Sequence, residues 1–126
     1  MPTVQDTNYL LLVTTAVLLD STYTLTLKDN FGRVFPKTTI EVNTALGVGV
    51  INLPSIASLG AAANNCEVVV VIDNDTSNLT IDPALTDTIG SAGAGVAYTV
   101  ASGGGAGQSV VLSPVDGTTW SILYTA

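Results

Sequence analysis

The chain has 126 residues, of which 47% are hydrophobic and only 10% charged, and ten acidic against three basic residues give a net charge of −7. An acidic chain lacks the positive surface that binds phosphate backbones, so nucleic acid and anionic membranes are not expected as partners. The chain contains no histidine, which removes Ser-His-Asp and Cys-His catalysis and the commonest zinc ligand. Its length predicts a single domain, residues 1–126.

The first nineteen residues divide into a polar and an apolar part. Met1–Asn8 is polar and is expected to be a loose N-terminal arm. Tyr9–Val13 and Val17–Leu19 are expected to form one kinked strand or two short ones. The apolar stretch Leu10–Leu19 is about half the length that spans a bilayer, and no basic residue precedes it. Neither a signal peptide nor a transmembrane segment is therefore expected.

Apolar and polar residues alternate in several later segments, as in strands with one buried face. Alternation marks Thr22–Lys28, Thr38–Val42, Val96–Val100 and Thr119–Tyr124, and further strands are expected at Arg33–Phe35, Val48–Leu53 and Ser109–Leu112, with a short segment beginning at Asp87–Gly90. Ser55–Ala63 is the candidate for a helical turn, and Gly60 limits its length. Asp116-Gly117 predicts a hairpin between the last two strands.

The chain is organised around one stretch, Glu67–Ile81, which reads EVVVVIDNDTSNLTI. Val68–Ile72 is a β-branched run typical of a strand buried on both faces, and the polar residues Asp73–Asn78 are turn formers. We therefore expect a β-hairpin over Glu67–Ile81 at the centre of the core. The residues expected to be substantially buried are Val69, Val71, Leu79, Ile81 and Trp120. Eight to ten short strands with frequent turn signals predict an all-β fold, a β-sandwich or a jelly roll.

Few residues suggest site chemistry. Asp73–Asn78 superficially resembles a calcium loop, but the EF-hand pattern needs Gly and Glu where this chain has Asn78 and Ala84. A plain turn is the better interpretation, with a looser cation site as the alternative. The lone Cys66 is expected to be a small core residue rather than a reactive or interchain thiol. Most aspartates lie beside turn residues, so no catalytic residue, metal or cofactor is expected.

All three basic residues lie within ten positions of one another, around a turn expected at Asp29–Gly32; they are Lys28, Arg33 and Lys37. One interpretation is that they balance local acids and keep the turn hydrated. The other is that this turn, together with Met1–Asn8, docks on an acidic patch of a partner protein, steered by opposite charge. Both interpretations remain open at the level of the sequence.

The order of motifs after Val48 resembles a small β-domain of tailed-bacteriophage virion proteins. The chain reads VINLPSIASLG, a Cys-Glu-Val strand ending in Asp-Asn, NLTIDPALTDTIG, a glycine-rich gap and GQSVVLSPVDGTTWSIL. The domain pattern has I-x-LP, an LTI strand, D-T-I-x-G, G-x-S-V-x-L and D-G-x-x-W-x-(I/V)-L in that order. The resemblance covers Val48–Leu123; the N-terminal half departs from the pattern, so the resemblance implies nothing about attachment.

The resemblance implies a jelly-roll-like or sandwich fold, a homotrimer and no enzymatic activity. The expected function is a capsid decoration or head-fibre protein, assembled in the host cytoplasm and carried in the virion. Its expected partners are further copies of itself and the major capsid protein or another virion protein. The low charge also favours an oligomer, because a monomer would expose much neutral surface. The alternative is a receptor- or carbohydrate-binding module of a tail fibre or tail tip.

Overall fold

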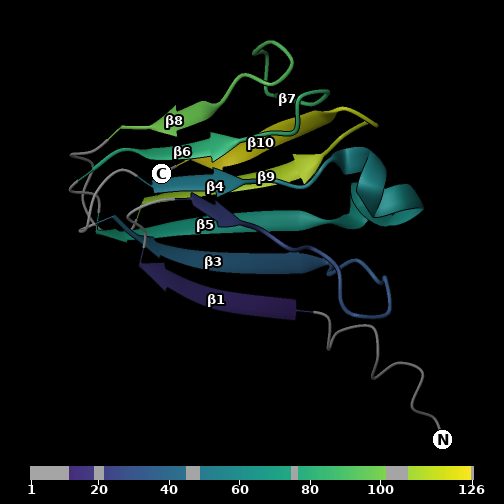
Figure 1. Cartoon of the computed structure of the whole chain (residues 1–126), viewed down its shortest axis with the longest axis horizontal. Coiled ribbons are helices and arrows are strands. Elements are labelled where there is room, and N and C mark those ends of the chain that lie inside the picture. Colours follow the sequence, from purple (N-terminus) through teal and green to yellow (C-terminus); the bar gives the residue numbers. More distant parts are fainter. Residues whose placement is uncertain (1–11, 19–21, 45–48, 75–76, 102–107, 126) are drawn as a thin grey trace, which may run out of the picture.

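Two β-sheets make up most of the protein in the computed structural model, which describes residues 12–18, 22–44, 49–74, 77–101 and 108–125 (Figure 1). The larger sheet contains, in spatial order, β1 (Leu12–Leu18), β3 (Lys37–Asn43), β5 (Glu67–Asn74), β9 (Gln108–Pro114), β10 (Thr119–Thr125) and β7 (Thr88–Ile89). The smaller sheet contains β2 (Thr22–Thr24), β4 (Gly49–Asn52), β6 (Leu79–Asp82) and β8 (Tyr98–Val100). The all-β prediction is confirmed, and ten strands in the described part lie within the expected number.

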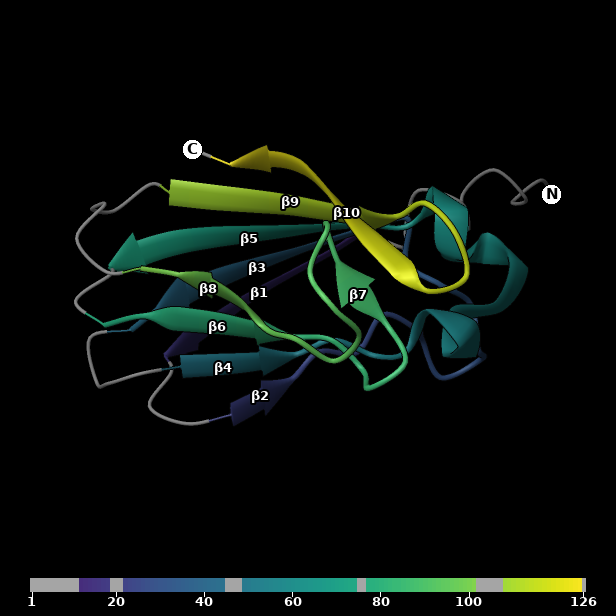
Figure 2. The ribbon, with the colours of Figure 1, turned by 90° about the horizontal axis from the view of Figure 1, so that it is seen from above.

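The chain alternates between the two sheets from β1 to β6, as Figure 2 shows from above. Each return adds a strand parallel to the previous one, so that β1, β3 and β5 are parallel in one sheet and β2, β4 and β6 in the other. The later strands β8 and β9 then pair antiparallel with β6 and β5. The pairing is therefore mixed, and the finer assignment to a sandwich or jelly roll stays a prediction.

The expected β-hairpin over Glu67–Ile81 is wrong. β5 lies between β3 and β9 in the larger sheet, whereas β6 lies between β4 and β8 in the smaller one. The segment that joins them crosses from one sheet to the other. The physical reason is that both strands bury one apolar face in a core that they share. Residues in a hairpin pair within one sheet, so β6 could not then have faced β5 across the core.

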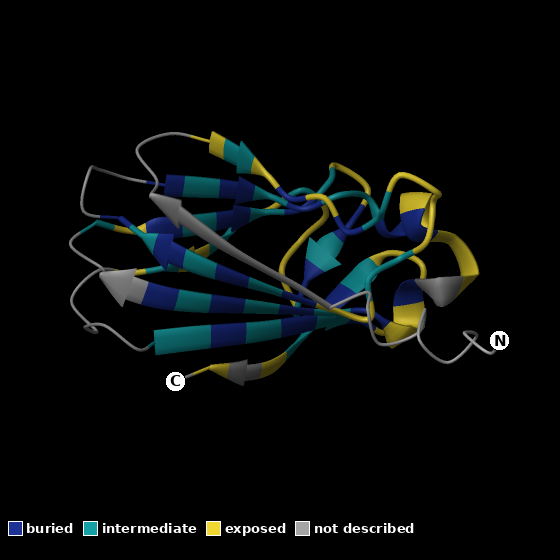
Figure 3. Cartoon of the chain, turned by 90° about the horizontal axis from the view of Figure 1, so that it is seen from below, coloured by how far each residue is buried: buried dark blue, intermediate teal, exposed yellow. Residues whose placement is uncertain are grey.

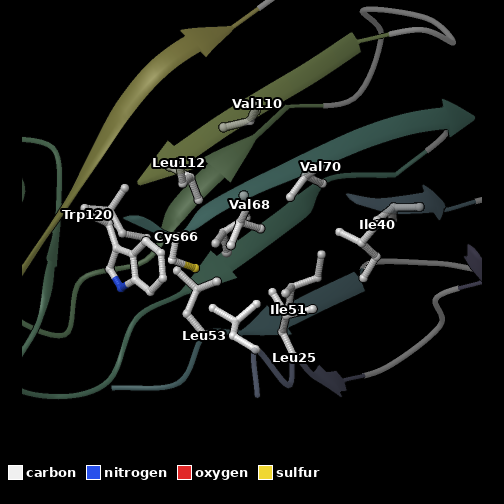
Figure 4. Close-up of a cluster of buried hydrophobic side chains, with 14 of the residues drawn as sticks. Leu25, Ile40, Ile51, Leu53, Cys66, Val68, Val70, Val110, Leu112 and Trp120 are labelled. Atoms are coloured by element: carbon white, nitrogen blue, oxygen red, sulfur yellow. The ribbon is translucent and has the colours of Figure 1, made fainter. Parts of the chain in front are cut away.

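One hydrophobic core lies between the sheets and takes residues from both (Figure 4). In β5, Val68, Val70 and Ile72 are fully buried, while Val69 and Val71 are half-buried on the opposite face. The prediction that Val69 and Val71 are substantially buried is therefore wrong, because the core residues of β5 are their immediate neighbours in the sequence. The strand has an inner and an outer face, as the alternating colours along the strands in Figure 3 show. Burial of Leu79, Ile81 and Trp120 is confirmed.

The shorter elements follow the sequence closely. The 3₁₀ helix η1 (Ile56–Asn65) begins after Ser55, whose Oγ accepts a hydrogen bond from the Ser58 backbone N–H at 3.3 Å. At Gly60 the backbone is non-helical with φ of 68°, which interrupts η1 as expected. β9 and β10 pair antiparallel around Asp116-Gly117, which confirms the C-terminal hairpin.

The N-terminal predictions are met in part. β1 is one continuous strand, whereas the expected arm Met1–Asn8 and the start of the apolar stretch lie outside the described residues. β2 is shorter than the alternating segment Thr22–Lys28, but the alternation holds, since Leu25 and Leu27 are buried. The return strand expected at Arg33–Phe35 is reduced to an isolated bridge between Lys28 and Val34.

Candidate functional site

The residues between β2 and β3 form a tight turn, residues 28–34, which we call the basic turn. Lys28 and Val34 pair antiparallel, and the Asp29 N–H donates to the Arg33 carbonyl oxygen at 2.9 Å. The Gly32 N–H donates back to the Asp29 carbonyl oxygen at 3.1 Å, and Gly32 has a φ of 80° that only glycine adopts easily. The sequence Asp-Asn-Phe-Gly therefore builds a closed loop at the position expected.

The Asp29 carboxylate holds the tip of the basic turn. Its Oδ1 accepts hydrogen bonds from the backbone N–H groups of Phe31 at 2.8 Å and Arg33 at 2.9 Å, and its Oδ2 pairs with the Arg33 Nε at 2.6 Å. Desolvation raises the pKa of Asp29, but these hydrogen bonds and the guanidinium charge outweigh it and lower the pKa below its usual value. The carboxylate is therefore ionised at neutral pH.

An aromatic side chain projects from this turn. Phe31 is 84% exposed, and the Arg33 guanidinium lies 5.5 Å from the centre of its ring, within the range of a cation–π contact. The sequence places Asp29 and Phe31 in a turn but does not indicate that Asp29 holds the turn or that Phe31 projects from it. The available signal was the Asp-x-Phe-Gly spacing, in which an Asp side chain reaches the N–H group two residues ahead.

Two of the three predicted docking residues already have partners within the chain. Lys28 Nζ donates to the Ser58 carbonyl oxygen at 2.6 Å, which fastens the basic turn to η1, and Arg33 pairs with Asp29. Lys37 is the first residue of β3 and is exposed. The structure therefore brings Lys28 and Arg33 together on one turn and leaves Lys37 at the start of the next strand. Docking of the three bases on a partner stays a prediction.

A hollow of about 380 Å³ opens between η1 and the turn joining β9 to β10. It is lined by Ile56, Ala57, Gly60, Ala61, Ala63 and Asn64 of η1 and by Asp116 and Gly117 of that turn. The wall is more apolar than polar and is made mostly of small residues, and it carries the carboxylate of Asp116 and the side-chain amide of Asn64. Asp116 Oδ1 accepts a hydrogen bond from the Thr118 N–H at 2.8 Å, and this bond above all lowers the pKa of Asp116.

A second aspartate, Asp87, is buried and joins two loops. It is 1% exposed, and its Oδ2 accepts a hydrogen bond at 2.8 Å from the backbone N–H of Ile56, the first residue of η1. Its Oδ1 accepts from the Thr86 hydroxyl at 3.2 Å. A helix start leaves N–H groups without intrahelical partners, and Asp87 supplies one acceptor from the loop before β7. The sequence alone predicts only that Asp87 begins a short segment at Asp87–Gly90.

The segments that carry the sequence resemblance are neighbours in space. β7, within the DTIG segment, pairs parallel with β10, within the DGTTW segment. The N–H groups of Thr88 and Gly90 donate to the carbonyl oxygens of Thr118 and Trp120, both at 2.8 Å. The hydrogen bond between Asp87 and Ile56 adds the segment that follows the LP pair. Three separated motifs therefore form one contiguous structural unit.

The single thiol is a core group, as expected. Cys66 is 1% exposed, and its sulfur lies among the apolar side chains shown in Figure 4. Burial, with a smaller contribution from the charge of Glu67, raises the pKa of the Cys66 thiol to about 11. A neutral, buried thiol is unreactive at physiological pH.

Within the described residues, no cluster of three or more Cys, Asp or Glu side chains could hold a metal ion. Residues 75 and 76 of the calcium-like segment lie outside the described part. Among the described helices none has the length and apolarity to cross a bilayer. Comparisons with protein-family models, with curated proteins and with solved structures find no match.

Proposed function

We propose that the chain is a structural subunit of a tailed-bacteriophage virion, a homotrimeric capsid decoration or head-fibre protein without enzymatic activity. The supporting observation is the contact among the segments of the resemblance. β7 pairs with β10, and Asp87 fastens the same unit to the start of η1. Motifs that contact one another in the fold are typical of a pattern that belongs to one structural domain. Chance matching of short motifs is therefore a weaker explanation of the resemblance.

The exposed surface also supports an assembled state. Large apolar side chains remain exposed on several loops and on β10, namely Leu85, Phe31, Val115, Leu123 and Val96. With charged residues at only 10% of the chain, little charge is present to keep this surface in water. Contacts with other copies and with the major capsid protein or another virion protein would cover it.

The alternative is a receptor- or carbohydrate-binding module of a tail fibre or tail tip. Sugar sites commonly stack the sugar ring on grouped aromatic side chains. The hollow beside η1 is lined by aliphatic and small residues and carries no aromatic ring on its described wall. Phe31 is exposed on the basic turn, and the hollow does not include it. A decoration protein is therefore the preferred function.

The test is to locate the protein in particles produced from the genome that encodes it. Purified particles are analysed by mass spectrometry, and antibodies against the recombinant protein are imaged on them by immunogold electron microscopy. We expect the protein to co-purify in many copies and the label to decorate heads. Label confined to the tail would support the alternative. Absence from the particles, while the protein is plainly made in the infected cells, would refute a role in the virion.

A further inference from the structure

The basic turn presents a fixed aromatic knob. Phe31 is 84% exposed, yet its backbone N–H is held by the Asp29 carboxylate at 2.8 Å. The Lys28 ammonium is bonded to η1, and Arg33 is paired with Asp29, so the base of the knob is fixed as well. A turn whose backbone is already held in place loses little conformational freedom on binding, and aromatic and Arg residues are enriched among the residues that dominate binding energy.

The same chain carries a hollow that fits such a knob. The hollow between η1 and the β9–β10 turn has a volume of about 380 Å³. The hollow is open to solvent, and its volume exceeds that of an apolar cavity of about 150 Å³ that binds benzene, so a benzyl side chain has room against its wall. Ile56 and the small side chains Ala57 and Ala61 supply an apolar lining, and at Gly60 no side chain narrows the space.

The charges of knob and hollow are complementary. Lys28 and Arg33 lie on the knob's turn, and the carboxylate of Asp116 lies on the wall of the hollow. The low pKa of Asp116 keeps that carboxylate charged at neutral pH.

Knob and hollow cannot meet within one copy as the chain is folded, because Phe31 is exposed. In Figure 1 the segment between β2 and β3 lies on one side of η1, and the turn joining β9 to β10 lies on the other. A contact between two different surfaces of identical subunits is heterologous, and it closes into a ring when the rotation between neighbours permits.

We infer that Phe31 of each copy inserts into the hollow beside η1 of a neighbouring copy, with Asp116 facing the basic turn, and that this head-to-tail contact builds a closed ring. The contact would form the homotrimer proposed above. It rests on that proposal only for the number of subunits, since the knob and the hollow are features of the isolated chain. In this arrangement the basic turn faces another copy, so attachment to the virion uses a different surface.

Sedimentation velocity of the isolated protein at micromolar concentration tests the inference. The wild type should sediment as a discrete oligomer. Phe31→Ala should raise the dissociation constant of the contact roughly 30-fold or more and give monomers. Thr99→Ala is the control, since Thr99 is exposed on β8 and lies outside the hollow, and it should leave the oligomer intact. Circular dichroism of each variant shows whether it is folded.

A mixing experiment then tests that knob and hollow meet each other. Ala61→Trp fills the hollow but keeps Phe31, and it should also give monomers. An equal mixture of Phe31→Ala and Ala61→Trp retains one intact hollow and one intact knob, so it should form a dimer that grows no further. The dimer would establish the pairing. A monomeric mixture, a monomeric wild type, or an unchanged oligomer for Phe31→Ala would each overturn it.

The outcomes separate this inference from the proposed function. If the wild-type oligomer survives Phe31→Ala while the protein is found on virions, the knob-and-hollow contact is wrong and the virion role stands. If the mixing experiment gives the dimer but the protein is absent from virions, the contact stands and the proposed function fails.

Discussion

Asp87 is predicted to be the polar residue on which the fold depends most. Asp87→Ala removes the acceptor for the buried N–H of Ile56 at the start of η1. A hydrogen bond to a charged acceptor contributes about 1.5–3 kcal/mol to stability. Leaving the N–H buried without a partner costs about 1–3 kcal/mol, and this cost is another measure of the same lost bond, so the two figures are not added. We therefore expect the free energy of unfolding to fall by about 2–3 kcal/mol. For a domain of this size that corresponds to a Tm lower by roughly 6–15 °C.

The measurement is urea unfolding at pH 7, followed by circular dichroism, with Tm from thermal unfolding as a second readout. Asp87→Asn keeps an acceptor oxygen and should cost about 1.5 kcal/mol or less. Asp116→Ala is the matched control, because it removes the same carboxylate from an exposed turn and should lower the free energy of unfolding far less than Asp87→Ala does. If Asp87→Ala unfolds within 0.5 kcal/mol of the wild type, roughly the scatter of neutral surface changes, the role given to this carboxylate is refuted.

The other predictions concern the core, the thiol and the three bases. Val70→Ala should cost about 2 kcal/mol and Val71→Ala under about 1 kcal/mol in urea unfolding, because only Val70 faces the core; equal losses would contradict the two faces of β5. Cys66 should resist a thiol reagent at pH 8 until urea unfolds the protein. Because its pKa is raised in the fold, stability should be full below pH 9 and decline as the pH rises towards 11, which unfolding measured across this range would show. Replacing all three bases with alanine tests docking by these residues, which is the alternative to the head-to-tail contact: occupancy of virions that is lower than for the wild type and less sensitive to salt supports docking, and unchanged occupancy places attachment elsewhere.

Local patterns in the sequence predicted most elements but not the sheet to which each belongs. The alternation in Thr22–Lys28 and the Asp116-Gly117 turn depend on neighbouring residues, and both were predicted correctly. Asp73–Asn78 has turn chemistry that serves a hairpin and a crossing between sheets equally well. The choice depends on β3 and β9, which occupy both edges of β5 and come from distant parts of the chain. A pattern of one segment contains no information about such neighbours.

The candidate site was harder to predict than the fold. The clustering of the three bases was visible in the sequence, but their partners were not. Lys28 bonds to Ser58, thirty residues away, and Asp87 bonds to Ile56, thirty-one residues away. The uniform run Val68–Ile72 likewise gave no indication of which face is inner, since every residue in it is apolar. That face is set by the register with β3 and β9.

The pairing order constrains how the chain can fold during synthesis. Of the eight ladders among the described strands, only the one between β9 and β10 joins consecutive strands. β5, the strand at the centre of the core, gains its second neighbour only when residues 108–114 have left the ribosome. Until then its edge is open to wrong partners, and contacts between distant residues form slowly. A nascent chain that pauses before Gln108 would therefore depend on chaperones, whereas the completed chain can close its own edge.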